Sequence, residues 1–376
     1  MGSTKTYKNL PKKVYIRTFG CQMNKRDSEI LAGALARRGA ALVGDWQDAD
    51  VILFNTCAVR RHAEDRVFSI LGLIAKKIKA RGQKKIIGLL GCMAQEWKGK
   101  AFKKAPYLDI VCGPNDIYKL IENLHSIIES KRKALFVDSD RRASEFYSDG
   151  AYFSEDPDHS FVIIMEGCNN FCSYCIVPYV RGRERSRPSK DILNEIKLLI
   201  KQGKSKFTLL GQNVNSYAGD IPFIELLKRA SDIPGVKELS FVTCHPKDAS
   251  IELFKLMAEM PNIKKYLHLP FQSGSNRILK LMNRGYTIER YIGLAKAFKE
   301  IVPGGYLSTD IIVGFPSESE DDFLATKAVL GQIEFGSAYI FKYSPRPYSK
   351  AADMTDDVAK EEKERRHKAL LDMMRS

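Results

Sequence analysis

The sequence predicts an α/β protein: a doubly wound parallel sheet followed by a partial TIM-type (βα)6 barrel. Between residues 13 and 130, short apolar runs alternate with segments of helical periodicity, which is typical of parallel sheets. From residue 160, six more strand–helix pairs follow, which is fewer than a closed eight-stranded barrel contains. We therefore expect an N-terminal domain at 1–130, a linker at 131–159, a barrel at 160–357 and a charged helical tail at 358–376.

The first domain contains four apolar runs that we interpret as strands: residues 13–19, 50–56, 85–91 and 107–111. Apolar residues at helical spacing predict helices from about Asp27, over 63–79 and from Asp116. A strand followed each time by a helix favours a parallel sheet with helices on both faces.

A cysteine follows each of these strands. Cys21, Cys57 and Cys92 each lie one or two positions beyond a strand, and Cys112 holds the same position after the fourth. The carboxyl ends of parallel strands share one edge of a sheet, where ligands bind, so these thiols are expected to converge. Three thiolates suit an iron–sulfur cluster with one open iron, whereas a lone thiol is more often simply packed. For Cys112, a fourth ligand and a buried thiol are both open at this point.

The linker is polar and shows neither helical nor strand periodicity. In the barrel, the predicted strands are residues 161–166, 206–211, 238–242, 266–269, 307–313 and 338–343. The predicted helices between and after them include 189–202, 223–231, 251–260, 288–302 and 320–332. Chemistry in such barrels is carried by loops at the carboxyl ends of the strands.

The loop after the first barrel strand contains Cys168, Cys172 and Cys175, separated by three and then two residues. A fully ligated cube takes four thiolates, and no fourth cysteine is near in sequence, so one iron would stay open to a ligand that is not protein. A zinc site generally needs a fourth Cys or His, and a disulfide would leave one of the three cysteines unpaired. The spacing favours a cluster.

Composition limits the classes of partner and location. The formal net charge is +15 with a pI near 9.3, which favours a polyanionic partner, although many basic proteins bind no nucleic acid. No apolar run approaches the roughly 20 residues that span a bilayer, and the first residues lack the apolar core of a signal peptide. We expect a cytoplasmic protein without membrane partners, in which eight cysteines serve as ligands rather than disulfides.

The cysteines stand in motifs that resemble those of the radical S-adenosylmethionine (SAM) methylthiotransferases. The resemblance runs in order over essentially the whole chain and rests on Thr18-Phe-Gly-Cys-Gln-Met-Asn, Asn55-Thr-Cys-Ala-Val-Arg, Gly91-Cys-Met-Ala-Gln, the cluster loop continuing into Val177-Pro-Tyr-Val-Arg-Gly-Arg-Glu-Arg-Ser-Arg, and Leu269-Pro-Phe-Gln-Ser-Gly-Ser. It implies a radical SAM barrel whose [4Fe-4S] cluster is held by Cys168, Cys172 and Cys175. It also implies an auxiliary [4Fe-4S] cluster on Cys21, Cys57 and Cys92, and it matches no ligand position to Cys112 or Cys244.

The same resemblance suggests SAM contacts. Tyr174 corresponds to an aromatic residue beside the adenine of SAM, and Gln212, Asn213 and Gln272 lie on loops where related enzymes contact SAM. Each amide is about as often a helix cap or turn residue. His268 is a candidate donor, although an ordinary hydrogen-bonded histidine is the better interpretation. Arg181, Arg183, Arg185 and Arg187 can hold the SAM carboxylate, the cluster loop or RNA phosphates, or form a surface ion-pair ladder with Glu184.

Within the family, Gly-Cys-Gln-Met-Asn is most similar to the branch that methylthiolates C2 of N6-isopentenyladenosine at position 37 of tRNA, consuming two SAM molecules. This implies the tRNA anticodon stem-loop as partner and an electron donor such as flavodoxin or ferredoxin. The alternatives are another methylthiolation target (threonylcarbamoyl-adenosine in tRNA or a ribosomal protein) and a non-catalytic iron–sulfur or zinc protein that binds RNA. Family members usually continue into an RNA-binding β-barrel, so we expect a shortened chain, whose Met1-Gly-Ser is typical of a cloning remnant.

Overall fold

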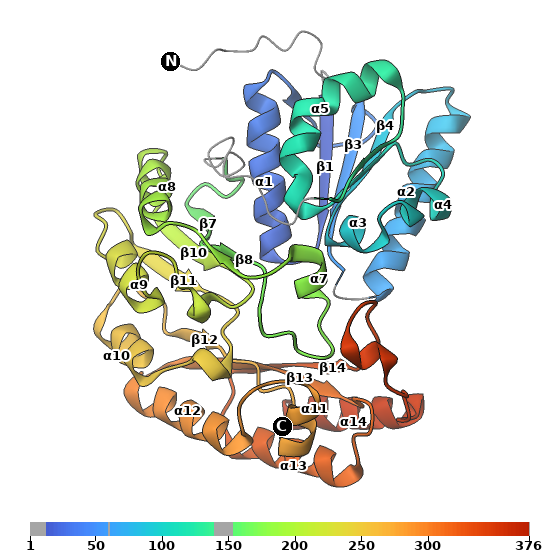
Figure 1. Cartoon of the computed structure of the whole chain (residues 1–376). Coiled ribbons are helices and arrows are strands. Elements are labelled where there is room, and N and C mark those ends of the chain that lie inside the picture. The colour runs from blue at the N-terminus through green and yellow to red at the C-terminus, as the bar shows by residue number, and fades with distance from the viewer. Residues whose placement is uncertain (1–12, 59–60, 139–152, 376) are drawn as a thin grey trace. The chain divides into compact units, whose positions relative to one another are not determined.

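The structure is a computed structural model that describes residues 13–58, 61–138 and 153–375. It contains two compact units (Figure 1). The N-terminal unit comprises the chain up to Asp156 together with Tyr179–Gly182, and the barrel unit comprises Pro157–Pro178 and Arg183–Ser376.

The N-terminal unit is built on a six-stranded sheet in the order β2-β1-β3-β4-β5-β6, and every neighbouring pair is parallel. The strands are β1 (Lys13–Phe19), β2 (Ala41–Leu42), β3 (Val51–Thr56), β4 (Ile86–Gly91), β5 (Ile110–Cys112) and β6 (Ala134–Phe136). All six residues of β3 are buried, as expected for a central strand with helices on both faces. The predicted doubly wound sheet is confirmed.

Helices cover both faces of this sheet (Figure 1). They are α1 (Gln22–Arg37) and α5 (Ile117–Ser130), and on the other face α2 (Arg61–Ala80), α3 (Cys92–Trp97) and α4 (Lys100–Lys104). One core cluster joins alternate residues of β3 and β4, such as Phe54 and Leu89, to Val67 and Leu71 of α2. The helix predicted from Asp27 begins five residues earlier, at Gln22, directly after Cys21.

Two strands of the sheet, β2 and β6, were not predicted, and β5 starts later than expected. Ala134–Phe136 pairs with β5 although it lies in the segment interpreted as an irregular linker, so that interpretation is wrong for these residues. The strand expected over 107–111 starts only at Ile110, because Pro106-Tyr-Leu forms a turn before it. Residues 139–152 of the expected linker lie outside the described part of the chain.

The barrel unit contains two three-stranded parallel sheets, β11-β10-β7 and β12-β13-β14. The strands are β7 (His159–Ile163), β10 (Lys206–Leu210), β11 (Glu238–Phe241), β12 (Tyr266–His268), β13 (Tyr306–Val313) and β14 (Ser337–Lys342). A parallel bridge between Leu239 and Ile263 connects the two sheets into one arc. The predicted partial six-stranded barrel is confirmed.

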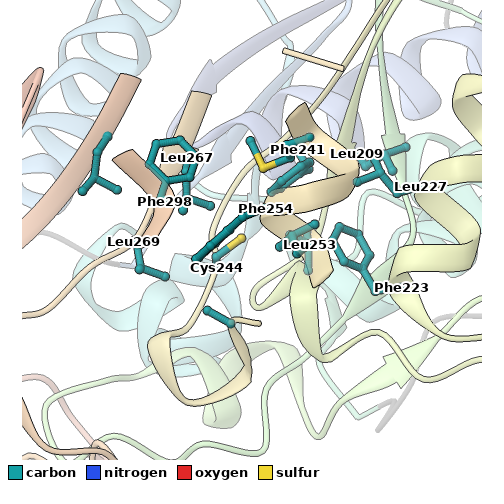
Figure 2. Packing of buried hydrophobic residues seen from close by; sticks show 14 of the residues in the cluster. Leu209, Phe223, Leu227, Phe241, Cys244, Leu253, Phe254, Leu267, Leu269 and Phe298 are labelled. Carbon is teal, nitrogen blue, oxygen red and sulfur yellow. The ribbon is translucent and has the colours of Figure 1, made fainter. Parts of the chain in front are cut away.

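Helices follow the barrel strands in turn: α8 (Ser189–Lys201), α9 (Phe223–Ser231), α10 (Ile251–Glu259), α11 (Asn276–Leu281), α12 (Ile288–Ile301), α13 (Glu320–Gln332) and α14 (Lys360–Met373). Near the cysteine loop lie α7 (Val177–Arg181) and the short antiparallel pair β8 (Met165–Glu166) and β9 (Arg185–Ser186). Short 3-10 helices occur at Pro114–Asp116, Val214–Ser216, Pro246–Asp248 and Lys350–Asp353. One apolar core runs under both sheets, and Figure 2 shows Phe254 and Phe298 within it.

Among the residues that the structure describes, no helix combines the length and apolar character needed to cross a membrane.

Candidate functional site

The first candidate site is the carboxyl edge of the N-terminal sheet, where Cys21 follows β1, Cys57 follows β3 and Cys92 begins α3 directly after β4. The backbone N–H of Cys57 donates to the carbonyl of Phe19 over 2.9 Å, which aligns the first two strand ends. A hydrogen bond from the thiol of Cys57 is the main cause that lowers the pKa of Cys21 to about 6, against the opposing effect of burial. The charge of Cys21 in turn helps to raise the pKa of Cys92. The structure therefore brings together the three cysteines that the sequence predicted to converge.

Two glycines make room for this approach. A Cβ at Gly91, whose φ is +87°, would lie 2.3 Å from Oδ1 of Asn55 and 2.6 Å from the carbonyl oxygen of Thr56. A Cβ at Gly20 would lie 2.8 Å from Cβ of Cys57. Distances below 3 Å are repulsive for any side chain, so each glycine lets the cysteine after it approach the neighbouring strand.

A pair of buried asparagines lies beneath the thiols. Nδ2 of Asn24 donates to Oδ1 of Asn55 over 3.0 Å and to the carbonyl of Thr56 over 3.2 Å. In return, Nδ2 of Asn55 donates to the carbonyl of Asn24 over 2.9 Å. The thiol of Cys21 donates to Oδ1 of Asn24 over 3.2 Å, so this pair also orients one of the three sulfurs. This role was not predicted from the sequence, although both asparagines belong to the motifs that carry the resemblance.

Arg181 contacts the same site from α7. Its Nε donates to Sγ of Cys92 over 3.3 Å, and its Nη2 lies 2.8 Å from Oδ2 of Asp27. Arg181 is only 2% exposed and Asp27 is fully buried. Burial raises the pKa of the Cys92 thiol, and the guanidinium opposes that increase. The roles predicted for Arg181 from the sequence did not include a contact with the N-terminal thiols.

Cys112 is completely buried at the end of β5, where its thiol donates to the carbonyl of Gly113 over 3.4 Å. Cys244 lies in the barrel core, and Figure 2 shows it beside Leu253, Phe254 and Leu269. Burial raises the pKa of Cys244 far above its usual range, which keeps this thiol protonated.

The second candidate site is the loop of Cys168, Cys172 and Cys175 in the barrel unit. Gly167, with φ of +76°, turns the chain out of β8, and its N–H donates to Oε1 of Gln212 over 2.5 Å. The N–H of Cys175 donates to the carbonyl of Cys172 over 2.9 Å, closing a tight turn. Burial, and then the charge of Cys172, raise the pKa of Cys175 to about 12, while Cys168 adds a smaller effect. The three thiols are therefore close enough to repel one another as thiolates.

Backbone groups from two distant segments hold this loop. The N–H of Ser173 donates to the carbonyl of Met282 over 3.0 Å, and its carbonyl accepts from the N–H of Ala351 over 2.7 Å. Nδ2 of Asn283 donates to the carbonyls of Asn170 and Phe171 over 2.9 and 3.1 Å. The position of the cysteines is thus set by the residues that follow α11 and by the 3-10 helix Lys350–Asp353, rather than by the loop alone.

Arg284 is a charged residue at this loop that was absent from the predicted site. Its Nη1 donates to Sγ of Cys172 and to Oη of Tyr174, both over 3.4 Å, and its Nη2 donates to the carbonyl of Pro270 over 2.8 Å. The side chain lies 5.3 Å from the centre of the Tyr286 ring and is 5% exposed. In the sequence, Arg284 lies four residues before the predicted helix 288–302, and this position identifies none of its partners.

The four predicted SAM-contacting residues occupy the same part of the barrel unit. Tyr174 packs against a cluster that contains Met282 and Phe315. Asn213 is 2% exposed and donates from Nδ2 to Oδ2 of Asp248 over 2.7 Å. Gln272 is 6% exposed, and its φ of +66° places it in a left-handed conformation that few side chains adopt.

The remaining arginines of the predicted series have separate partners within the barrel unit. Arg187 is buried and lies 2.8 Å from Oε2 of Glu195, Arg183 lies 5.1 Å from the Phe171 ring centre, and Arg185 donates to the carbonyl of Arg183 over 3.1 Å.

Similarity to known proteins agrees with these two sites. A model of the Radical SAM superfamily matches residues 162–330, and a model described as Uncharacterized protein family UPF0004 matches residues 13–113. The tRNA-2-methylthio-N(6)-dimethylallyladenosine synthase of Acetivibrio thermocellus is 45% identical over 98% of this chain and 78% of its own length. The protein of the same name from Caldicellulosiruptor saccharolyticus is 45% identical over the whole of this chain and 80% of its own.

The chain belongs to the radical SAM methylthiotransferase family. The resemblance identified from the cysteine motifs is thereby confirmed, and a radical SAM enzyme implies a [4Fe-4S] cluster and SAM. Among solved structures, the radical SAM methyltransferase TsrM of Kitasatospora setae matches with a TM-score of 0.65 and 16% identity over 90% of this chain and 75% of TsrM. OxsB, a cobalamin-dependent SAM radical enzyme, matches with a TM-score of 0.61 and 15% identity over 97% of this chain and 56% of OxsB. These two matches agree on the fold.

The donor set of this methylthiotransferase suits a cluster better than a single ion. Within the described ranges, no three His, Cys, Asp or Glu side chains gather closely enough to hold one metal ion. In a cubic cluster each thiolate binds a different iron, so its ligand sulfurs stand further apart than ligands around one ion. Three cysteines on a single loop, with the buried Arg284 beside Cys172, are a donor set of the kind that binds such a cluster.

Proposed function

We propose that this protein adds a methylthio group to C2 of N6-dimethylallyladenosine (N6-isopentenyladenosine) at position 37 of tRNA, using two SAM molecules. The observation that carries this proposal is the 41–45% identity, over 94–100% of this chain, to eight proteins named tRNA-2-methylthio-N(6)-dimethylallyladenosine synthase. The motif Gly20-Cys-Gln-Met-Asn supports the same branch over those acting on threonylcarbamoyl-adenosine or a ribosomal protein.

In this proposal Cys168, Cys172 and Cys175 hold the cluster that binds SAM, in the barrel domain at 160–357. The domain at 1–130 holds an auxiliary [4Fe-4S] cluster on Cys21, Cys57 and Cys92. When bound, the first cluster with SAM supplies a radical that removes the C2 hydrogen, and the second supplies the sulfur that replaces it. C2 carries no acidic proton, so a side-chain base alone is insufficient for this substitution.

The residues around the barrel cysteines support a SAM-binding role. Oδ1 of Asn213 and Oε1 of Gln272 are buried and lack hydrogen-bond partners among the described residues, which is costly unless a ligand supplies donors. The ammonium group of SAM is a donor of that kind. Gln212 orients the turn before Cys168, and Tyr174 offers a ring beside the same loop.

The partner in this proposal is the tRNA anticodon stem-loop, and the net charge of +15 favours its approach. A target base in such a loop can leave its stack and enter a protein site. The radical step also needs one electron from a donor such as flavodoxin or ferredoxin. We assign the protein to the cytoplasm on the basis of this substrate.

The test is nucleoside analysis by mass spectrometry of an anticodon stem-loop incubated anaerobically with reconstituted protein, SAM and dithionite. We expect a 2-methylthio product from RNA containing N6-dimethylallyladenosine and much less from RNA containing adenosine. Product only from threonylcarbamoyl-adenosine would assign the protein to the other tRNA branch. Release of no 5′-deoxyadenosine under any condition would exclude radical SAM activity.

A further inference from the structure

One face of the sheet β12-β13-β14 is lined by polar and aromatic side chains. In each strand, alternate residues point to this face, which we call the open face: Tyr266, His268, Tyr306, Ser308, Asp310, Ser337 and Tyr339. The alternating residues of the opposite face, such as Leu267, Leu307 and Ile311, belong to the apolar core. All open-face residues except Ser308 keep some exposure to solvent. A ligand can therefore reach this face.

A histidine–carboxylate pair lies on the open face. Nε2 of His268 is 3.5 Å from Oδ2 of Asp310, and the two side chains are 16% and 27% exposed. Nδ1 of His268 lies 2.9 Å from Oγ of Ser308, which also lies 2.8 Å from Oη of Tyr266. Because Nδ1 is engaged with a buried hydroxyl, Nε2 and the carboxylate of Asp310 are the groups that can bind a ligand.

This pair is adjacent to the cysteine loop. His268 ends β12, and two residues later the carbonyl of Pro270 accepts from Arg284, which also donates to Cys172. On β13, the next residue of the open face after Asp310 is Ile312, which lies in the cluster against which Tyr174 packs. His268 therefore lies at the carboxyl end of β12 and Asp310 in the middle of β13, and both are connected to the network around the proposed SAM cluster.

A cavity of about 500 Å³ extends along the same face toward the amino ends of the strands. Its lining includes Tyr266, Tyr306 and Tyr339, together with Lys264 and Lys265. The rings of Tyr266 and Tyr306 stack with centres 5.6 Å apart, and the Tyr339 ring lies edge-on to His268 at 6.1 Å. Tyr339 lines this cavity and also contacts His268, so a planar ligand bound at the histidine has an aromatic neighbour beside it.

We propose that His268 and Asp310 bind the target adenine of the substrate RNA through its hydrogen-bonding edge. This deepens the proposed function and rests on it. An N6-substituted adenine keeps one N6–H, which a carboxylate accepts, and carries a neighbouring ring nitrogen, to which an imidazole N–H donates. The carboxylate of Asp310, 3.5 Å from Nε2, favours the tautomer with the proton on that nitrogen, so Asp310 and Nε2–H offer this complementary pair, while Ser308 holds Nδ1 in place.

The test uses the reconstituted enzyme and an anticodon stem-loop containing N6-dimethylallyladenosine. His268→Asn keeps a polar group near Ser308 but loses the hydrogen-bond donor at Nε2. Asp310→Asn loses the negative charge of the carboxylate. Asp310→Asn loses a hydrogen bond to a charged group and should weaken RNA binding by roughly tenfold or more, whereas His268→Asn loses a neutral hydrogen bond and should weaken it about threefold to tenfold. His268→Gln, whose amide reaches further, should restore part of the affinity. The control His125→Asn makes the same substitution at a histidine of α5 that pairs with Glu129, and it should bind RNA as the wild type does.

A second probe is the same stem-loop with a methyl group in place of the remaining N6 hydrogen. The wild type should bind it more weakly than the parent RNA, whereas Asp310→Asn should not distinguish the two. SAM affinity and 5′-deoxyadenosine release without RNA should stay unchanged in all variants, which also reports an intact fold. Unaltered RNA binding in both His268→Asn and Asp310→Asn, or a parallel loss of SAM binding, would overturn the inference. Failure of the proposed function is distinct from this: the wild type itself would then form no methylthio product.

Discussion

Arg284 donates from Nη1 to the sulfur of Cys172 over 3.4 Å, although 112 residues separate the two in sequence. The N-terminal unit contains a similar arrangement, since Nε of Arg181 donates to the sulfur of Cys92 over 3.3 Å. Each cysteine trio thus has a buried guanidinium at one of its thiols. A cation in that position stabilises the thiolate, the form that binds iron, and the added negative charge of a reduced cluster.

Replacement of Arg284 should therefore change the redox behaviour of the barrel cluster. Arg284→Gln removes the charge, and we expect a reduction potential more negative by an amount on the order of 65–130 mV, from about 1.5–3 kcal/mol for a charged hydrogen bond in a one-electron couple. Arg284→Lys keeps the charge and should shift the potential less. The measurement is an EPR-monitored redox titration of protein whose N-terminal cysteines are alanine. Equal potentials in the wild type and Arg284→Gln would contradict this role.

Triple replacement of Cys168, Cys172 and Cys175 by alanine should remove one cluster only. Reconstituted wild-type protein should contain about eight irons, and this variant about four. It should release no 5′-deoxyadenosine from SAM under dithionite. Iron and sulfide analysis with chromatography of the nucleoside checks both outcomes; complete loss of iron would mean that the two sites are not independent.

Replacement of Cys21, Cys57 and Cys92 by alanine separates the two halves of the reaction. The variant should keep about four irons and still release 5′-deoxyadenosine, because no barrel ligand is changed. It should form no methylthio product, since the proposed sulfur site is gone. Mass spectrometry of the digested RNA beside the yield of 5′-deoxyadenosine measures both; any methylthio product would show that the sulfur comes from elsewhere.

Cys112→Ala is the matched control for the N-terminal triple variant. The Cys112 thiol is fully buried and donates to the carbonyl of Gly113, and the family motifs assign it no ligand role. We expect full iron content and full methylthiolation, with a loss of stability of about 1 kcal/mol for a small buried side chain. A variant that lost half of its iron would make Cys112 a ligand.

His245 should make stability depend on pH. Burial, and then the charges of Arg284 and Lys247, lower its pKa to about 2. Below about pH 6.5 the unfolded chain therefore binds a proton that the folded protein does not, and the free energy of unfolding falls by up to about 1.4 kcal/mol per pH unit. His245→Asn keeps an acceptor for the N–H of Lys247 and should lose this contribution. Urea denaturation at pH 7 and pH 5 tests it; identical pH dependence in both proteins would contradict the assignment.

The fold followed closely from the sequence because most of its strands are apolar runs bounded by polar turns. The exceptions are β2 and β6, which have two and three residues and lie at the edges of the sheet. Ala134–Phe136 follows Lys131-Arg-Lys, so its charged surroundings hid a strand that is defined by pairing with β5 rather than by its own pattern. The start of α1 was placed too late because Cys21, its N-cap, makes no side-chain cap hydrogen bond.

Only those residues of the candidate site that are close in sequence, or that follow strands of one parallel sheet, could be predicted. The convergence of Cys21, Cys57 and Cys92 followed from a rule of parallel sheets, and Cys168, Cys172 and Cys175 are neighbours along the chain. Arg284 and Asp310 could not be found in this way, because each meets its partner across tens of residues. Such contacts depend on strand register and loop path, which no short pattern contains.

The two halves of the barrel meet at a narrow seam. Only the Leu239–Ile263 bridge joins β11 to β12 in the described chain, through hydrogen bonds from Leu239 to Asn262 over 2.8 Å and from Lys264 to Leu239 over 2.9 Å. Each half is continuous in sequence, so each can form from local contacts before the seam closes, which favours rapid folding. The amide hydrogens of Leu239 and Lys264 should accordingly exchange with deuterium sooner than those in the middle of β10 or β13.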